Sequence, residues 1–377
     1  MQAAMDCLPG SDDVFGPQVL GCRDFDFTLL FEQTILQVGS CAALLLSVIP
    51  RVLYLRTQPV KATGNTLTYF KLGAVTALAC TQVAMLVVWS VNPVFRNRAS
   101  IPATVVSLLA SVALCFLSFV EDSRSVRPSS LINAYLLASI VLDLPQARTL
   151  WLRPIPTSLP GIFTTGVLAK AVSACLEACS KRQYLFAQYR SDAPEMLVSL
   201  YDRTMLWWLN PIFQLGFRNQ IASADMLPLD SGLKSEHLSR TFQAIWARRK
   251  SSSKPRPLFW ALVSYCKAAV LAFVAPRLVL SAFKLSQPLL INSVTSIMAK
   301  KLTKETTNSG RGLVGATAAI YCGLAISNVL YKRQLQRFQT KLRGVLATSL
   351  YRKMLELPSH NLADNTAITL YVVQHFF

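Results

Sequence analysis

Residues 258–298 read "LFWALVSYCKAAVLAFVAPRLVLSAFKLSQPLLINSVTSIM", and this stretch decides the fold class of the chain. It is apolar almost throughout, whereas a helix needs only about 20 apolar residues to cross the hydrocarbon of a bilayer. As one helix it would be about 60 Å long, roughly twice the hydrocarbon thickness. The stretch therefore predicts a membrane helix that either projects well beyond the bilayer or breaks at a proline.

The composition of the whole chain indicates the same class. Of its 377 residues, 52% are hydrophobic and only 15% are charged, whereas soluble domains carry about a quarter charged residues. The net charge of +19 could indicate a nucleic-acid partner. However, the basic residues lie in blocks beside apolar runs, as they do at the cytosolic flanks of membrane spans. We therefore expect an all-α polytopic membrane protein whose partner is the lipid bilayer, and no nucleic acid.

Other apolar runs have the length of membrane spans. The fourth is the weakest, because Asp143 lies near its end. Together with residues 258–298 they predict seven transmembrane helices. The runs cover approximately residues 33–50, 69–90, 101–120, 130–145, 159–180 and 312–331.

The distribution of basic residues predicts the orientation. The loop after the first run is expected to be cytosolic, because it holds Arg51, Arg56, Lys61 and Lys71. Residues 181–257 carry twelve basic and six acidic residues, and an extracytoplasmic N-terminus followed by five spans would place them in the cytosol. The first 28 residues lack the basic start of a signal peptide.

These observations divide the chain into three predicted parts. Residues 1–180 form a five-helix N-terminal transmembrane domain, and residues 181–257 form a cytosolic linker. Residues 258–377 contain two further membrane helices and a basic cytosolic extension.

Cysteine and histidine side chains predict no metal site. The nine cysteines and three histidines lack the close, paired spacing that zinc ligands require. Cys7 and Cys22 share the N-terminal tail, where a disulfide and two free thiols are open alternatives.

Ionisable residues within membrane spans usually have a functional role, because their burial in lipid is costly. Arg277 and Lys284 fall within about 20° of each other around a helix, with Lys267 about 80–100° away. This basic stripe would suit an anionic or polarised ligand in a water-filled cavity. Alternatively, Lys267 extends to the cytosolic interface and Lys284 pairs with a residue elsewhere in the bundle, but Arg277, which lies deepest in the run, is hardest to explain in this way. Lys170 and Glu177 are expected to form a helix-end pair.

The sequence contains no G-x-S-x-G or H-E-x-x-H motif. Residues 310–317, "GRGLVGAT", have the glycine spacing of a phosphate-binding loop, but Ala316 stands where the lysine is required. We interpret these glycines as a loop-to-helix junction and expect no enzymatic activity.

An unusually aromatic segment lies in the predicted linker. Residues 204–220, "TMLWWLNPIFQLGFRNQ", combine Trp207 and Trp208 with further aromatics between two arginines. Tryptophan favours the headgroup layer, so we expect a kinked segment that lies in the membrane interface. An ordinary soluble aromatic cluster is the alternative.

This segment resembles the one that precedes the first core transmembrane domain in the long, multidrug-resistance-protein type of ABC exporters (the C subfamily), and fungal members most of all. The likeness extends to the layout of five extra N-terminal helices, a lasso-like linker and the first two core helices. The segment is matched by Trp207, Trp208, Asn210, Pro211, Phe213, Gly216, Arg218, Asp225, Leu227, Leu229 and Asp230.

The resemblance implies ATP-dependent export of amphipathic or anionic organic compounds across a plasma or vacuolar membrane. In that family a basic residue eleven positions before a proline in the first core helix helps to bind anionic substrates. Counting back from Pro288 gives Arg277. The family pattern fades from about Ala367, and ATP and magnesium would act on nucleotide-binding domains that this sequence does not include.

A second hypothesis from another class remains open. The chain could be a non-transporting membrane module, or a truncated product, that serves as a platform for trafficking or for a partner. An in-frame continuation into nucleotide-binding motifs would favour the exporter, whose remaining part would then be the partner.

Overall fold

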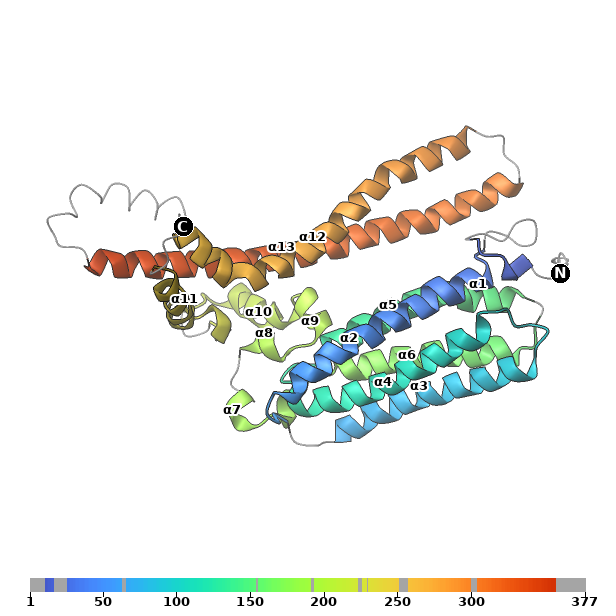
Figure 1. The fold of residues 1–377 in the computed structure, drawn as a ribbon, viewed down its shortest axis with the longest axis horizontal. Coiled ribbons are helices and arrows are strands. Elements are labelled where there is room, and N and C mark those ends of the chain that lie inside the picture. Colours follow the sequence, from blue (N-terminus) through green and yellow to red (C-terminus); the bar gives the residue numbers. More distant parts are fainter. Residues whose placement is uncertain are drawn as a thin grey trace. The chain divides into compact units, whose positions relative to one another are not determined.

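The computed structural model describes residues 11–16, 26–62, 66–153, 155–190, 193–222, 226–228, 230–250, 257–299 and 304–356. Within these ranges the chain is almost entirely helical and has no β-strand beyond one isolated bridge (Figure 1). Seven described helices are long and apolar enough to cross a membrane, which confirms the all-α polytopic fold class. The chain forms two compact units, Met1–Met226 and Leu227–Phe377.

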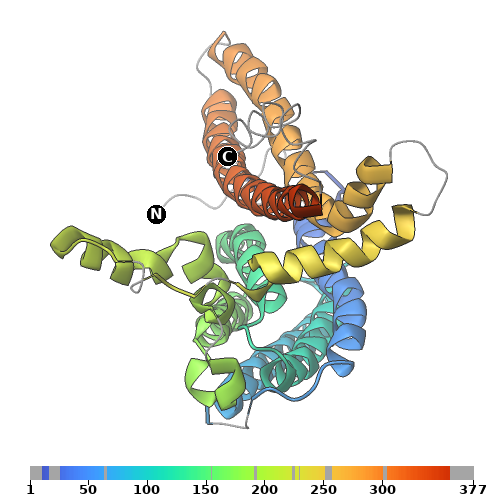
Figure 2. The same ribbon diagram turned by 90° about the vertical axis from the view of Figure 1, so that its left-hand side faces the viewer.

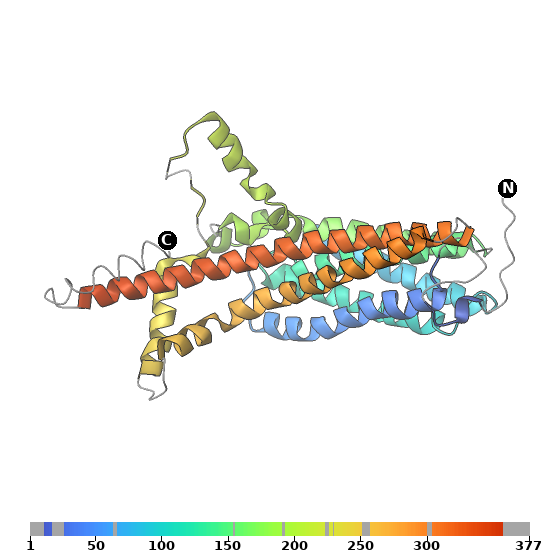
Figure 3. The same ribbon diagram turned by 90° about the horizontal axis from the view of Figure 1, so that it is seen from above.

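Five membrane-length helices lie side by side in the first unit (Figures 1, 2 and 3). The first of them, Leu29–Arg56, contains a π-helical segment, Glu32–Val38, between α1 and α2. Each predicted run is helical, and the helices extend beyond the apolar runs at most of their ends. The elements are α1 (Leu29–Phe31), α2 (Gly39–Arg56), α3 (Thr66–Val91), α4 (Ser100–Arg124), α5 (Ser130–Leu152) and α6 (Ser158–Ala178).

Small side chains allow the helices of this bundle to approach closely. One face of α4 is buried from end to end and is built mainly of serine, threonine and alanine. Small residues bring helix backbones together where no hydrophobic effect drives association. Gly166 of α6 serves the same purpose, because a Cβ atom there would lie 3.3 Å from the Thr81 hydroxyl of α3.

The start of the linker folds onto one end of the five-helix bundle. This end, where α6 finishes and residue 181 follows, is here called the linker end. Leu185 forms an antiparallel bridge with Ala62, and the Phe186 amide donates to the Lys61 carbonyl at 3.2 Å. Short helices follow, and Leu197 packs with Leu185 and Ala62. These helices are α7 (Ala187–Arg190), α8 (Pro194–Leu197), α9 (Leu200–Thr204) and α10 (Asn210–Arg218).

The second unit contains α11 (Ser235–Lys250) and two very long helices, α12 (Pro257–Met298) and α13 (Lys304–Glu356). α12 continues through Pro276 and Pro288, so the alternative of a helix that breaks at a proline was wrong. It bends partway along (Figure 1), as prolines without an N–H group allow. α11 packs on the two long helices through Leu238 and Phe242.

The glycine-rich stretch at residues 310–317 lies inside α13, which begins at Lys304. The expectation of a loop-to-helix junction at these glycines was therefore wrong. The polar residues from Lys304 onward that precede the apolar run continue the helix instead of interrupting it.

Two aromatic contacts hold α12 and α13 together. A Cβ atom on Gly323 would overlap the Phe283 ring, so the phenyl ring covers the bare backbone of α13. Farther along, the rings of Phe273 and Phe338 lie 5.3 Å apart. These contacts fix the register of the hairpin.

Replacing Gly323 with leucine should therefore force α12 and α13 apart. Overpacking of this kind costs about 1–3 kcal/mol, so the unfolding temperature in detergent should fall by several degrees. Gly315→Leu is the matched control, because a Cβ atom at that position has no neighbour within 4 Å. An equal loss of stability in both variants would contradict the proposed contact.

Candidate functional site

The three basic residues singled out on α12 are all exposed within the second unit. Arg277 and Lys284 are seven residues apart, which places them on one face of the helix with about 10.5 Å between them along its axis. Lys267 lies about 15 Å from Arg277 by the same measure and closer to the start of the helix.

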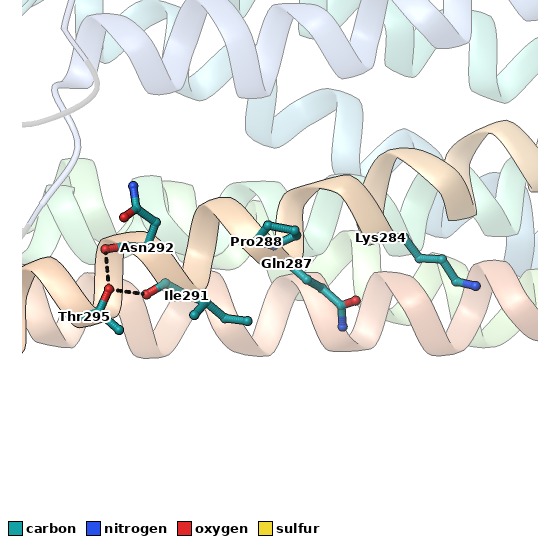
Figure 4. A pocket seen from close by; sticks show the side chains of 6 residues that line it. All are labelled: Lys284, Gln287, Pro288, Ile291, Asn292 and Thr295. Carbon is teal, nitrogen blue, oxygen red and sulfur yellow. Dashed lines mark hydrogen bonds between the residues drawn. The ribbon is translucent and has the colours of Figure 1, made fainter.

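Lys284 lines a shallow groove of about 530 Å³ on α12 (Figure 4). Gln287 and Asn292 add amide groups to the groove. Pro288 has no N–H group to donate to the Lys284 carbonyl, so this backbone acceptor loses its usual partner within the helix. A cation and two side-chain amide groups thus line the groove.

Arg277 does not line this groove, and neither does Lys267. The guanidinium carbon of Arg277 instead lies 5.0 Å from the ring centroid of Tyr331 on α13. The structure therefore aligns Arg277 and Lys284 on one face but does not gather the three basic residues into a single pocket. Tyr331, Gln287 and Asn292 were not identified from the sequence, because uncharged polar residues in a long apolar run gave no signal of their own.

Acidic residues are almost absent from these two helices. α12 contains none, and α13 contains only Glu305 and Glu356, at its two ends. In the described part of the chain, neither Arg277 nor Lys284 forms an ion pair. The positive charge of the stripe is therefore not neutralised within the described hairpin.

In the five-helix unit, by contrast, buried charged side chains form ion pairs. At the linker end, buried carboxylates and basic side chains from α2, α3, α4, α6 and the first linker residues form one network. The ion pairs are Arg51–Glu121 at 2.6 Å, Lys71–Asp122 at 3.1 Å, Lys71–Glu177 at 3.3 Å and Lys181–Asp122 at 2.8 Å.

Lys181 ties the linker into this network, and its side chain is only 3% exposed. Its ammonium also donates to the Glu121 carbonyl oxygen at 3.1 Å. Burial lowers the pKa of Lys181, and the neighbouring Asp122 carboxylate opposes that shift. The linker therefore begins with a buried ion pair.

Two expectations about charged residues were wrong. Lys170 and Glu177 do not pair with each other: Lys170 contacts Asp143 of α5, whereas Glu177 contacts Lys71 and accepts a hydrogen bond from Ser118. Lys71 was counted in a loop, but it lies within α3 and its side chain is 1% exposed. In each case the partner lies on another helix, where helical spacing gives no information.

The aromatic linker segment is broken at Leu206, which adopts a left-handed conformation with φ of 57°. This conformation is uncommon for a residue other than glycine and marks a sharp change of chain direction. Pro211 lies in the first turn of α10, where its missing N–H group costs nothing. The kink therefore precedes the proline.

Aromatic side chains lie on the outside of this segment. Trp207 and Phe213 are each 64% exposed and Phe217 is 93% exposed, while Trp208 is half-buried. Asn210 and Arg218 lie beside the exposed rings and line the same open groove. Such a combination of apolar rings and a basic end is typical of interfacial helices.

Gly216 shapes the end of α10. A Cβ atom there would lie 2.8 Å from Cδ1 of Ile221, because the chain folds back over the helix.

Among the described residues, no group of three or more His, Cys, Asp or Glu side chains could hold a metal ion. Cys7 and Cys22 lie outside the described residues, as do Asp225 and Leu229 of the aromatic motif.

Comparison with known proteins identifies relatives of the chain. Residues 10–164 match the family model described as ABC transporter TMD0 domain. The chain is 34% identical to an ABC-type transporter of Gibberella zeae, 32% to the ABC multidrug transporter lscH of Purpureocillium lilacinum and 30% to ABC multidrug transporter B of Aspergillus fumigatus. These alignments cover 93–95% of this chain and 23–25% of the relatives, so the chain spans about a quarter of their length.

Replacing Lys71 with methionine should destabilise the five-helix unit strongly. Removal of one partner from a buried ion pair typically costs about 3–5 kcal/mol, which corresponds to an unfolding temperature lower by roughly 10 °C. Heating in detergent followed by size-exclusion chromatography measures this shift. The exposed Arg56→Met variant controls for loss of a basic residue, and a similar shift in both would show that the network contributes little.

Trp207 and Trp208 should lie at the depth of the lipid headgroups. In proteoliposomes, their fluorescence should be quenched more by lipids brominated near the headgroup than by lipids brominated at the bilayer centre. The signal lost in a Trp207→Phe/Trp208→Phe variant isolates their contribution, and Trp89→Phe, which removes a fully buried indole, is the control. Equal quenching by both lipids would refute the interfacial placement.

Proposed function

We propose that the chain, whose residues 10–164 match the TMD0 domain of ABC transporters, forms the N-terminal portion of an ATP-dependent exporter. Its substrates are amphipathic, anionic organic compounds such as xenobiotics, conjugates or secondary metabolites. The observation that carries this proposal is the exposed basic stripe of Arg277 and Lys284, which has no acidic partner among the described residues.

Several features of the stripe favour an anionic ligand. A charge within a membrane span is costly unless a partner or water compensates it. α12 contains no acidic residue that could compensate the charge of Arg277 or Lys284. The groove at Lys284 adds amide groups that would bind polar atoms next to the anion. The apolar surface of α12 around these groups would accommodate the hydrophobic part of an amphipathic molecule. Lys267, nearer the start of α12, would attract anions toward the stripe.

The proposed orientation places the linker end in the cytosol and the N-terminus outside it, in a plasma or vacuolar membrane. The excess of basic residues in 181–257 supports this orientation. The aromatic face of α10 would then lie in the cytosolic leaflet and hold the linker to the bilayer.

ATP and Mg²⁺ would act on nucleotide-binding domains, and the residues of this chain do not fit that role. Residues 310–317, which have glycines at the required spacing, lie in a helix and have Ala316 in place of the lysine. The energy for transport would therefore come from another part of the exporter, with which the α12–α13 hairpin would pack.

Few of the hairpin's apolar residues are buried, which favours such a partner. In the most apolar stretch of each helix, 11% of the residues of α12 and 6% of those of α13 are buried. The corresponding share is 22–44% in the five helices of the first unit. Lipid also covers apolar surface, so the exposed basic residues of α12, Arg277 and Lys284, are the stronger reason to expect further helices around the hairpin.

Arg277→Ala in the full-length exporter should impair uptake of an anionic conjugate into inside-out vesicles more than uptake of its neutral analogue. Loss of a charge-assisted contact predicts a change of roughly tenfold or more for the anion. Arg277→Lys, which keeps the charge, should lie between the wild type and Arg277→Ala. If both substrates lose equally, Arg277 has no electrostatic role in substrate binding.

A further inference from the structure

The contact between Arg277 and Tyr331 has a defined place in the hairpin. Arg277 lies between Phe273 and Phe283 on α12, and both of these rings contact α13. Tyr331 lies correspondingly between the two α13 positions that they meet, Gly323 and Phe338. Because the register is fixed on either side, the tyrosine ring is held next to the guanidinium group.

The two side chains differ in exposure in a way that suits a binding site. Tyr331 is half-buried in the hairpin, whereas Arg277 is exposed, and its guanidinium carbon lies 5.0 Å from the ring centroid. A cation over an aromatic face is attracted by the negative charge of the π-system. The ring therefore restrains the guanidinium without neutralising its charge, as a carboxylate would.

The chemistry of arginine gives this restraint a consequence. A guanidinium group is planar and carries five N–H donors in a rigid fork, whereas an ammonium group is a point charge on a flexible stem. When a ring occupies one face, the N–H donors at the edges stay available. Those edges match the two oxygens of a carboxylate, which accepts two parallel hydrogen bonds.

We propose that Tyr331 is a positioning residue that holds the Arg277 guanidinium with its N–H edge toward the ligand, and that the pair selects substrates bearing a carboxylate. This inference rests on the proposed function and specifies the anion that the exporter takes. Lys284, two helical turns away, supplies a second positive charge but no fork.

The test measures vesicle uptake of an amphipathic carboxylate and of its neutral primary amide by the full-length exporter. Tyr331→Leu should raise KM for the carboxylate about fivefold, with little change in maximal rate and none in KM for the amide. Tyr331→Phe keeps the ring and should stay within about twofold of the wild type. Unfolding temperatures of both variants monitor folding.

A double-mutant comparison separates positioning from general packing. In an Arg277→Lys background, Tyr331→Leu should add no further change, because the planar group that the ring holds is already absent. The inference is overturned if Tyr331→Leu raises KM for carboxylate and amide alike, or if it acts equally in both backgrounds. Failure of the proposed function looks different, because Arg277→Ala would then transport the carboxylate as the wild type does.

Discussion

The cost of an unpaired charge in hydrocarbon is the constraint on which the five-helix unit depends. Lys71 is fully buried in α3 and contacts carboxylates from both α4 and α6. Loss of either carboxylate would leave its ammonium only partly compensated, at a cost of several kcal/mol. Because these partners are distant in sequence, the network forms only when the right helices are neighbours. It therefore specifies the arrangement of the bundle, while the small residues of α4 determine how closely the helices approach.

The two units use charge for opposite purposes. In the five-helix unit, buried basic residues such as Lys71, Lys170 and Lys181 each contact a carboxylate, and these pairs leave little electrostatic attraction for a ligand. In the α12–α13 hairpin, basic residues outnumber acidic ones greatly, and Arg277 contacts an aromatic ring instead of an acid. Unneutralised charge destabilises an isolated hairpin but attracts anions, and for this reason the proposed substrate site lies in the second unit.

Features that depend on neighbouring residues in the sequence were predicted, whereas contacts between distant residues were not. Membrane spans depend on local hydropathy, so all seven were located, including the weak one whose Asp143 is paired with Lys170. The shared face of Arg277 and Lys284 needed only the geometry of one helix. The partners of Lys71 and Lys170 lie on other helices, so the spacing along one helix could not identify them. Lys71 was placed in a loop because every basic residue close to an apolar run was taken to be exposed to water. Tyr331 was missed because its place opposite Arg277 depends on a hairpin register that Phe283 and Gly323 set.

The length of α13 has a mechanical consequence. The contact at Gly323 lies partway along a 53-residue helix, and about 50 Å of that helix follow it before Glu356. A rigid rod of that length amplifies rotation: a tilt of about 5° around the contact would move the far end by roughly 4 Å. Phe273 and α11 also contact α13 beyond Gly323, so such a tilt would carry these neighbours along, and a slight adjustment of the hairpin around a bound molecule would displace them together.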